Sequence, residues 1–210
     1  SFPAFSRLQE SKELLTKAIE KTLFGISATI FPISVGLLFF VSPIVDLVPR
    51  YEKWQPALLS FYLFAVASAI SSLSTPLTNA LNAVGKIRIT LWLMVLWTSL
   101  TWVLTILLIP LFGFDGVAMA LLLITTTLIL VVWLVKQIAQ FSFWTSIKSP
   151  IVASVLQAVG YVVLLGIIPR TTIGYVLAGL SGVILYTVTL WLLERTRIIQ
   201  FVQIFRGIRS

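Results

Sequence analysis

The residues with the clearest potential for chemistry lie in residues 57–84, an apolar stretch that carries many hydroxyl and amide side chains. Its polar residues recur at steps of three and four: Ser68, Ser71, Thr75, Thr78 and Asn82. On a helix this spacing places them in one stripe, with Ser72 and Asn79 beside it. Hydroxyl and amide groups both donate and accept hydrogen bonds, so the stripe could hold a polar molecule such as a sugar.

Two interpretations of this polar stripe are open. Its side chains line a water-filled cavity and bind a polar cargo, or they let two helices approach each other closely. The first interpretation defines a candidate site of five residues: Ser71, Thr75, Thr78, Asn79 and Asn82. Close packing is favoured at the serine and threonine positions. The two interpretations are balanced at Asn79 and Asn82, because an amide is costly to bury in lipid.

Two basic residues, Lys86 and Arg88, follow directly after the stripe. They could bind a phosphate or pyrophosphate at the membrane surface, or act only as anchors that fix the topology of the chain. The 28 residues of the stretch before them would form a helix roughly 42 Å long, against a hydrocarbon core of ~30 Å. The stretch must therefore tilt, kink at Pro76 or protrude from the bilayer.

The composition indicates that lipid surrounds much of the chain. Of its 210 residues, 59% are hydrophobic and 10% are charged, and the mean hydropathy is +1.05. About a quarter of the residues of a soluble domain are charged. The absence of Cys and His excludes disulfides, thiolate metal sites and the usual general base, so we expect no enzyme activity, metal or cofactor. The net charge of +8 indicates contacts with anionic lipid head groups rather than with nucleic acid.

Six apolar runs are long enough to cross a bilayer: 23–48, 57–84, 90–112, 116–135, 150–168 and 172–193. An amphipathic segment, 1–22, precedes them, and a basic tail, 194–210, follows them. The sequence thus predicts an all-α integral membrane protein with a bundle of six transmembrane helices. The amphipathic segment is either a helix on the membrane surface or an extension of the first span.

The positions of the basic residues predict how the spans are oriented. Twelve of the 15 Lys and Arg residues lie in the N-terminal segment, the second and fourth connections and the tail, and three lie in the other connections. In membrane proteins the cytoplasmic loops carry the excess of basic residues. We therefore expect a multi-pass protein of the plasma (inner) membrane with both ends of the chain in the cytoplasm.

Individual residues predict how the spans meet and end. Pro32 and Pro43 in the first span suggest a kinked or jointed helix, whose freed carbonyls neighbouring helices must satisfy. Gln157 in the fifth span is expected to bond to a neighbouring helix. In the sixth span, small residues at steps of four allow close packing: Gly174, Ala178 and Gly182. Between the third and fourth spans, Gly113 suits a helix C-cap and Asp115 an N-cap.

Four segments within residues 2–135 together resemble a known family. The first is FPAFSRLQESKELLTKAIEK, a P-x-x-S-R-L loop followed by a charged helix. The second is the proline-containing first span, which ends in Pro-Ile-Val, with the connection from Tyr51 to Ala57. The third is NALNAVGKIR (79–88), and the fourth is IPLFGFDGVAMA (109–120). In order and spacing they are similar to the polysaccharide flippases of the multidrug/oligosaccharidyl-lipid/polysaccharide exporter superfamily, the O-antigen and exopolysaccharide translocases called Wzx or RfbX-like proteins.

This resemblance implies the C-terminal half of a longer transporter, with the six spans as one of two lobes around a central cavity. Such proteins move a lipid-pyrophosphate-linked oligosaccharide to the outer leaflet by alternating access, for the synthesis of cell-surface polysaccharide. The implied partners are membrane lipid, the lipid-linked oligosaccharide and an N-terminal lobe upstream of Ser1. The same motifs imply that Asn79, Asn82, Gly85 and Lys86 lie at the cytoplasmic end of a helix that lines the cavity.

Other functions fit the sequence less well. A multidrug or cation exporter of the same superfamily is disfavoured by the basic charge balance and by the lack of acidic residues inside the spans. A membrane-embedded glycosyltransferase or polymerase subunit would need paired acidic or basic residues on its loops, and Asp46, Glu52 and Asp115 are isolated. A membrane scaffold without transport activity is a further alternative.

Overall fold

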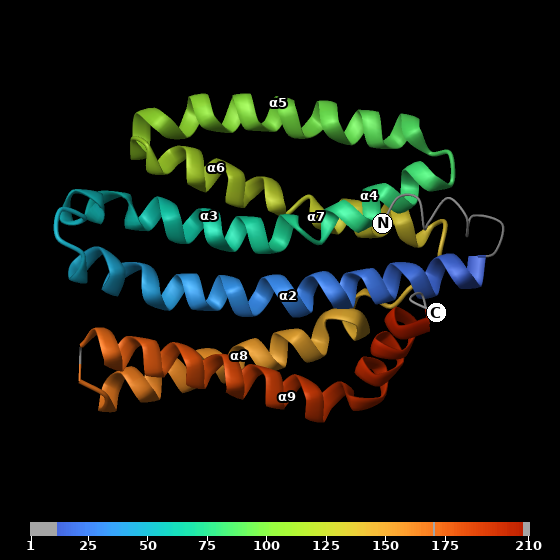
Figure 1. The fold of residues 1–210 in the computed structure, drawn as a ribbon. Coiled ribbons are helices and arrows are strands. Elements are labelled where there is room, and N and C mark those ends of the chain that lie inside the picture. The colour runs from blue at the N-terminus through green and yellow to red at the C-terminus, as the bar shows by residue number, and fades with distance from the viewer. Residues whose placement is uncertain (1–11, 170, 208–210) are drawn as a thin grey trace.

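The computed structural model describes residues 12–169 and 171–207, with side chains described as far as Arg195. The regular structure in this part of the chain is helical, without a strand (Figure 1). Six helical stretches in it are long and apolar enough to cross a membrane: Lys12–Leu47, Glu52–Ala83, Ile87–Phe112, Asp115–Lys136, Phe143–Ile167 and Thr172–Arg195. The prediction of an all-α chain with six apolar helices is therefore confirmed.

The first helix, α2 (Lys12–Leu47), runs without a break from the charged segment into the first predicted span. Its 36 residues make it about 54 Å long, which is longer than a hydrocarbon core of ~30 Å. Segment 12–22 is thus an extension of the span, and residues 1–11 of the predicted amphipathic segment lie outside the described part of the chain. A short 3₁₀ helix, η1 (Glu52–Ala57), connects α2 to the second span.

The second predicted span is broken into two helices: α3 (Leu58–Ser71) and α4 (Ser74–Ala83). The break lies about one turn before Pro76, whose missing N–H leaves the Ser72 carbonyl without its helical partner. At the break the backbone tightens, because the Leu73 N–H bonds to the Ile70 carbonyl three residues earlier (3.1 Å). Of the three alternatives predicted for this long stretch, the structure shows the kink, centred on residues 72–73.

The fourth predicted span is also broken, although its sequence indicates one continuous helix. It forms α6 (Asp115–Thr125) and α7 (Leu128–Lys136), and no proline lies within it. Three consecutive threonine hydroxyls bond to carbonyls three residues earlier in the helix: Thr125, Thr126 and Thr127. Hydroxyls that bond back in this way compete with the helical backbone and bend it. Because α3 packs on α6 and α4 packs on α7, the two broken spans lie side by side.

The remaining helices are α5 (Ile87–Phe112), α8 (Phe143–Ile167) and α9 (Thr172–Gly207). Helix α8 begins at Phe143, before the predicted start of the fifth span at about Pro150. Glu20 of α2 accepts a hydrogen bond from the Ser142 N–H (2.8 Å), which satisfies a backbone donor just before the helix. The predicted end of the sixth span coincides with non-helical backbone angles at Glu194, and the tail side chains beyond Arg195 lie outside the described part.

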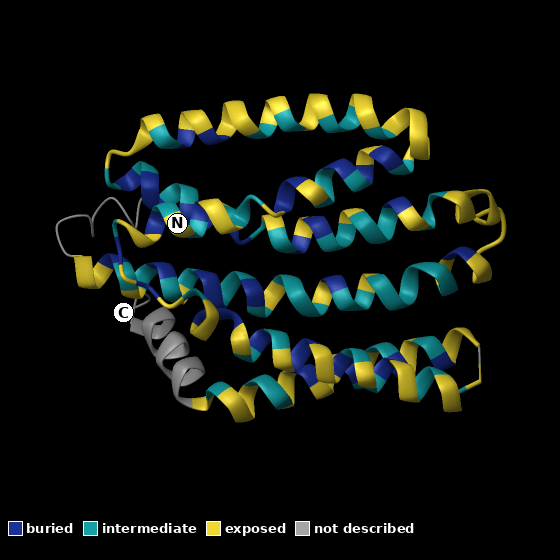
Figure 2. Ribbon diagram, turned by 180° about the vertical axis from the view of Figure 1, so that it is seen from behind, coloured by how far each residue is buried: buried dark blue, intermediate teal, exposed yellow. Residues whose placement is uncertain are grey.

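The long helices pack side by side in the order α9, α8, α2, α3, α6, α5 (Figure 1). At one end α4 and α7 continue α3 and α6, and there a cluster of buried side chains forms the core. It draws on α2, α4, α5, α7 and the segment before α8 and includes Leu15, Leu77, Val131 and Phe141. Figure 2 shows that α5, at the edge of the row, is mostly exposed. Its buried residues are Thr90 and Leu93.

The connections alternate between the two ends of the row (Figure 1). One end holds the start of α2, the α4–α5 turn, the α7–α8 connection and the end of the apolar part of α9; we call it the basic end. Its described basic residues are Lys12, Lys17, Lys21, Lys86, Arg88, Lys136, Lys148 and Arg195, whereas Arg50 and Lys53 lie at the opposite end. The charge asymmetry expected from the sequence is therefore present between the two ends of the fold.

Candidate functional site

The turn between α4 and α5 has a defined geometry. The Lys86 N–H bonds to the Leu81 carbonyl (2.9 Å), and the Gly85 N–H bonds to the Asn82 carbonyl (3.1 Å). Together with the positive φ of Gly85, 76°, these bonds form a Schellman motif, which ends a helix at a glycine. The motif fixes the start of α5 relative to the end of α4, and so places Thr90 and Asn82 around one hollow.

The polar stripe lies on the side of α3 and α4 that is not packed against other helices. Ser68, Ser71 and Thr75 are exposed, and Thr78, Asn79 and Asn82 are half-buried. The buried residues of α4 form its opposite side: Pro76, Leu77, Ala80, Leu81 and Ala83. Close packing against another described helix of this chain is therefore not the role of Ser71 or Thr75.

Two hydroxyls of the stripe region bond within their own helix. Ser72 Oγ donates to the Ala69 carbonyl (2.7 Å), and Thr78 Oγ1 lies within bonding distance of the Ser74 and Thr75 carbonyls (3.2 and 3.0 Å). A hydroxyl that donates its proton keeps its lone pairs, so it can still accept a bond from a ligand. Ser72 and Thr78 can therefore act as acceptors for a ligand although their protons are already engaged.

The stripe ends at a hollow of about 360 Å³ between α4 and α5. Three polar and three apolar residues line it: Asn79, Asn82, Thr90, Ile87, Leu91 and Met94. Asn82 Oδ1 and Thr90 Oγ1 are buried atoms without a hydrogen-bond partner, and Thr90 as a whole is only 3% exposed. Three other buried atoms of the described residues also lack a partner, and one of them, Ser154 Oγ, lies alone in another, otherwise mainly apolar hollow. Because buried polar atoms are normally paired, the pair of unpaired atoms in one place makes the hollow between α4 and α5 the best candidate for ligand binding in the described part of the chain.

The structure brings only part of the predicted site together. Asn79 and Asn82 line the hollow, whereas Ser71, Thr75 and Thr78 lie along the stripe outside it. The place of Thr90 does not follow from residue spacing, because a single threonine at the start of an apolar run belongs to no stripe. The available signal was its position in the first turn of the helix that follows the Gly-Lys turn.

Lys86 and Arg88 are exposed on the turn beside the hollow, and neither forms part of its lining. Both residues belong to the basic end, where lipid phosphates would lie if this end meets the cytoplasmic leaflet. Contact between these two side chains and a phosphate group stays a prediction.

A second set of polar residues joins α2, α8 and α9. Tyr186 Oη donates to the Ala28 carbonyl (2.8 Å), which is the carbonyl that Pro32 deprives of its helical donor. Gln157 Nε2 donates to Tyr161 Oη (2.9 Å) and lies 3.4 Å from the Pro32 carbonyl oxygen. The predicted partner for the carbonyl freed by Pro32 and the predicted interhelical bond of Gln157 are both confirmed.

The predicted close packing in the sixth span is confirmed as well. A Cβ atom on Gly182 would lie 2.0 Å from Cε1 of Tyr161, and Ala178 is fully buried. The Tyr161 ring is in turn held edge-to-face by Phe40, with ring centroids 4.9 Å apart. Helices α8 and α9 therefore meet through a small residue on one side and a buried aromatic ring on the other.

The predicted N-cap role of Asp115 is wrong. The N-cap of α6 is Phe114, and no side chain caps it. Asp115 is the first residue of α6 and accepts a hydrogen bond from Ser60 of α3 (2.5 Å). A carboxylate in the first turn is favoured by the helix dipole, and here it also ties two helices together. Gly113 ends α5 as predicted, with a φ of 60°.

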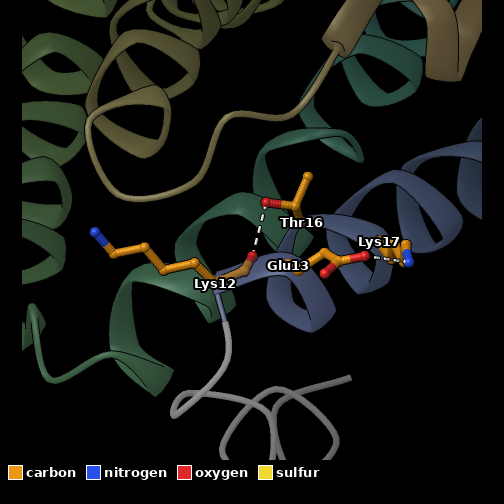
Figure 3. A network of polar contacts seen from close by, with 4 residues as sticks. All are labelled: Lys12, Glu13, Thr16 and Lys17. Carbon is orange, nitrogen blue, oxygen red and sulfur yellow. Dashed lines mark hydrogen bonds and ion pairs between the residues drawn. The ribbon is translucent and has the colours of Figure 1, made fainter.

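A second polar hollow, of about 440 Å³, lies at the basic end between the start of α2 and the segment after α7. Lys12 and Lys136 are among its lining residues. Glu13 pairs with Lys17 (2.6 Å), and Figure 3 shows the Lys12 side chain pointing away from that pair. This hollow gathers positive charge, but none of the buried unpaired atoms of the described residues lines it.

The fold and the site together indicate the class of protein to which this chain belongs. The six long apolar helices, the alternating connections and the basic end fit a multi-pass helical membrane protein. Among the described residues no group of three His, Cys, Asp or Glu side chains could hold a metal ion. Comparison of the chain with protein families, curated proteins and solved structures found no match.

Proposed function

We propose that this chain forms one lobe of a membrane transporter that moves lipid-linked oligosaccharides across the plasma membrane by alternating access. The chain contributes one wall of the transport cavity, formed by the polar stripe on α3 and α4. A second lobe supplies the opposite wall, and the cavity opens to each side of the membrane in turn as the lobes rock against each other.

The observation that carries this proposal is the exposure of the stripe on an otherwise apolar span. Ser71 and Thr75 are exposed although they lie within the membrane-spanning stretch Glu52–Ala83. Polar groups that face hydrocarbon lack hydrogen-bond partners and are costly there. Water in a transport cavity, or a polar cargo, supplies those partners.

The broken helices give further support. Transporters commonly build their substrate sites from discontinuous helices, whose freed backbone groups face a cavity. The break between α3 and α4 lies within the stripe, and its neighbour α6–α7 is broken beside it.

The charge asymmetry supports an orientation for the proposal. With the basic end in the cytoplasm, as basic loops favour, Lys86 and Arg88 lie where the phosphates of a cytoplasmic-leaflet lipid would be. Sugar hydroxyls of the same lipid would then reach the amides of Asn79 and Asn82. The stripe continues from there toward the middle of the membrane, which gives the cargo a path across it.

Translocation of a fluorescent lipid-linked oligosaccharide can test this proposal in proteoliposomes that hold the full polypeptide with both lobes. We expect Asn82→Leu and Lys86→Ala each to lower the initial rate about tenfold, the effect of losing roughly 1.4 kcal/mol of binding to the transition state. Lys53→Ala removes a lysine from the opposite end and serves as the matched control, with an unchanged rate. Wild-type rates in both Asn82→Leu and Lys86→Ala would contradict the assigned site.

A further inference from the structure

If α5 crosses the membrane, the hollow between α4 and α5 lies near one membrane surface, because the first two turns of α5 form one side of it. It spans the first two turns of α5, from Ile87 to Met94, a distance of about 10 Å along the helix axis. The polar layer on each side of a bilayer is roughly 5–8 Å thick. A ligand in this hollow would therefore have its polar part at the head-group layer and its apolar part in the outermost hydrocarbon.

The apolar side of the hollow faces away from the protein. Ile87, Leu91 and Met94 are 64%, 60% and 55% exposed, and on a helix their spacing places them on one side of α5. In a membrane, lipid chains cover such a surface. The hollow thus combines an apolar side open to lipid with a polar side made by Asn79, Asn82 and Thr90.

The two unpaired atoms restrict the chemistry of the occupant. Asn82 Oδ1 is an acceptor, so it needs a donor, and Thr90 Oγ1 can serve as either. Phosphate and ester oxygens of a lipid only accept hydrogen bonds. The donor must therefore be a hydroxyl or an ammonium group of the lipid head.

Charge decides between these two donors. Lys86 and Arg88 are exposed on the adjoining turn, and the described basic end carries far more basic residues than the opposite end. This charge favours a lipid with a net negative head over a zwitterionic one, because each basic residue near the surface attracts anionic lipid. An ammonium group would add a further positive charge at this turn.

We propose that the hollow binds an anionic membrane lipid whose head group carries free hydroxyls, with Asn82 and Thr90 as its hydrogen-bonding pair. The head hydroxyls bond to Asn82 Oδ1 and Thr90 Oγ1, the phosphate lies toward Lys86, and a chain lies along Leu91 and Met94. This inference does not rest on transport. A resident phosphatidylglycerol and a polyprenyl-phosphate sugar share this chemistry, and the experiment below distinguishes them.

The experiment measures lipid binding to the purified, delipidated full chain by native mass spectrometry. Three lipids with the same acyl chains are compared: phosphatidylglycerol has a charge and hydroxyls, phosphatidylmethanol has the charge alone, and phosphatidylethanolamine is zwitterionic with an ammonium donor. We expect phosphatidylglycerol to bind about tenfold more tightly than phosphatidylmethanol, and phosphatidylethanolamine to bind weakest. Equal affinities for phosphatidylglycerol and phosphatidylmethanol, or a preference for phosphatidylethanolamine, would overturn the proposal.

Variants assign the selectivity to the hollow. Thr90→Val keeps the shape of the side chain and removes the unpaired hydroxyl, so we expect it to abolish the preference for phosphatidylglycerol without lowering the thermal midpoint. Thr90→Ser, which keeps a hydroxyl, should retain the preference. Thr101→Val is the matched control on the same helix, because the Thr101 hydroxyl already bonds to the Trp97 carbonyl (2.7 Å). An unchanged preference in Thr90→Val would overturn the assignment.

A fourth lipid, a polyprenyl-phosphate hexose, distinguishes the two sources. Tighter binding of this lipid than of phosphatidylglycerol, with the same loss in Thr90→Val, would support the inference and identify the cargo as the occupant. Tighter binding of phosphatidylglycerol would support the inference with a resident lipid. Lipid binding is measured separately from translocation. The lipid-binding proposal can therefore hold even if the transport proposal fails.

Discussion

Two regions of the molecule contain a proline inside a span together with neutral polar side chains. The polar side chains bond to neighbouring helices in one region and are exposed in the other. Where α2, α8 and α9 meet, the carbonyl freed by Pro32 is paired with Tyr186, and Gln157 is fully buried. Along α3 and α4, the span breaks before Pro76, and Ser71 and Thr75 are exposed. We call the first the closed region (Pro32, Gln157 and Tyr186) and the second the open region (the polar stripe and Pro76).

The difference shows that polar residues in an apolar helix do not by themselves indicate a site. In the closed region Tyr186 bonds to the Ala28 carbonyl and Gln157 Nε2 reaches the Pro32 carbonyl, so these side chains have a structural role, although Gln157 Oε1 is a buried atom without a partner. In the open region the unpacked side of the helix carries the polar groups, and the stripe ends at the two unpaired atoms of Asn82 and Thr90. A binding site is therefore indicated where two unpaired polar atoms line one hollow at the end of an exposed polar stripe.

The largest expected effect is in the closed region, where Gly182→Ala should destabilise the fold. Its Cβ would lie 2.0 Å from the buried Tyr161 ring, which Phe40 holds in place, so the helices must move apart. Overpacking of this kind costs about 1–3 kcal/mol or more. Thermal or denaturant unfolding in detergent measures it. Gly36→Ala is the matched control within α2, because nothing lies within 4 Å of its Cβ; equal unfolding midpoints would contradict tight α8–α9 packing.

A smaller effect is expected for Tyr186→Phe, which removes the donor to the Ala28 carbonyl. We expect a loss of about 1 kcal/mol in the free energy of unfolding. In a Pro32→Ala background the helix regains a backbone N–H for that carbonyl, so the same tyrosine substitution should cost much less. Unfolding of the single and double variants measures this coupling. A cost for Tyr186→Phe that does not depend on residue 32 would show that the hydroxyl does not compensate for the proline.

The smallest effect on stability is expected in the open region. Ser71→Ala removes an exposed hydroxyl that is not needed for packing, so the free energy of unfolding should change by less than about 0.5 kcal/mol. The same unfolding assay as for the closed region measures it. A loss comparable to that of Tyr186→Phe would mean that the stripe has a structural role and would remove the contrast between the regions.

Features that depend on composition or local spacing were predictable from the sequence. Six long apolar runs define the six spans whatever their partners, and Gly113 ends α5 for reasons of local backbone geometry. The step of four between Ala178 and Gly182 predicts close helix packing without knowledge of the neighbour. Gln157, an amide in the middle of an apolar span, had to find a partner, so its interhelical bond could be expected as well.

Features that depend on which helices meet could not be predicted in the same way. The break at Thr126 comes from side chains that bond back to their own helix, and threonines in a span can equally leave it straight. The start of α8 at Phe143 follows Ser142, whose N–H donates a hydrogen bond to Glu20, a residue far away in the sequence. Asp115 looked like a local cap and instead pairs with Ser60 of α3. The place of Thr90 beside Asn82 results from the Schellman turn and not from any spacing within one helix.

The central claim is that the stripe faces water rather than lipid, and the absence of native cysteines allows a direct measurement. Ser71→Cys and Thr75→Cys are compared with Val103→Cys and Val183→Cys, which are also exposed but lie on the apolar surfaces of α5 and α9. The rate of modification by a charged, membrane-impermeant thiol reagent is measured in membranes that hold the protein. We predict that the two stripe cysteines react at least about tenfold faster than the two controls. Stripe cysteines as unreactive as those at Val103 and Val183 would contradict a water-facing stripe.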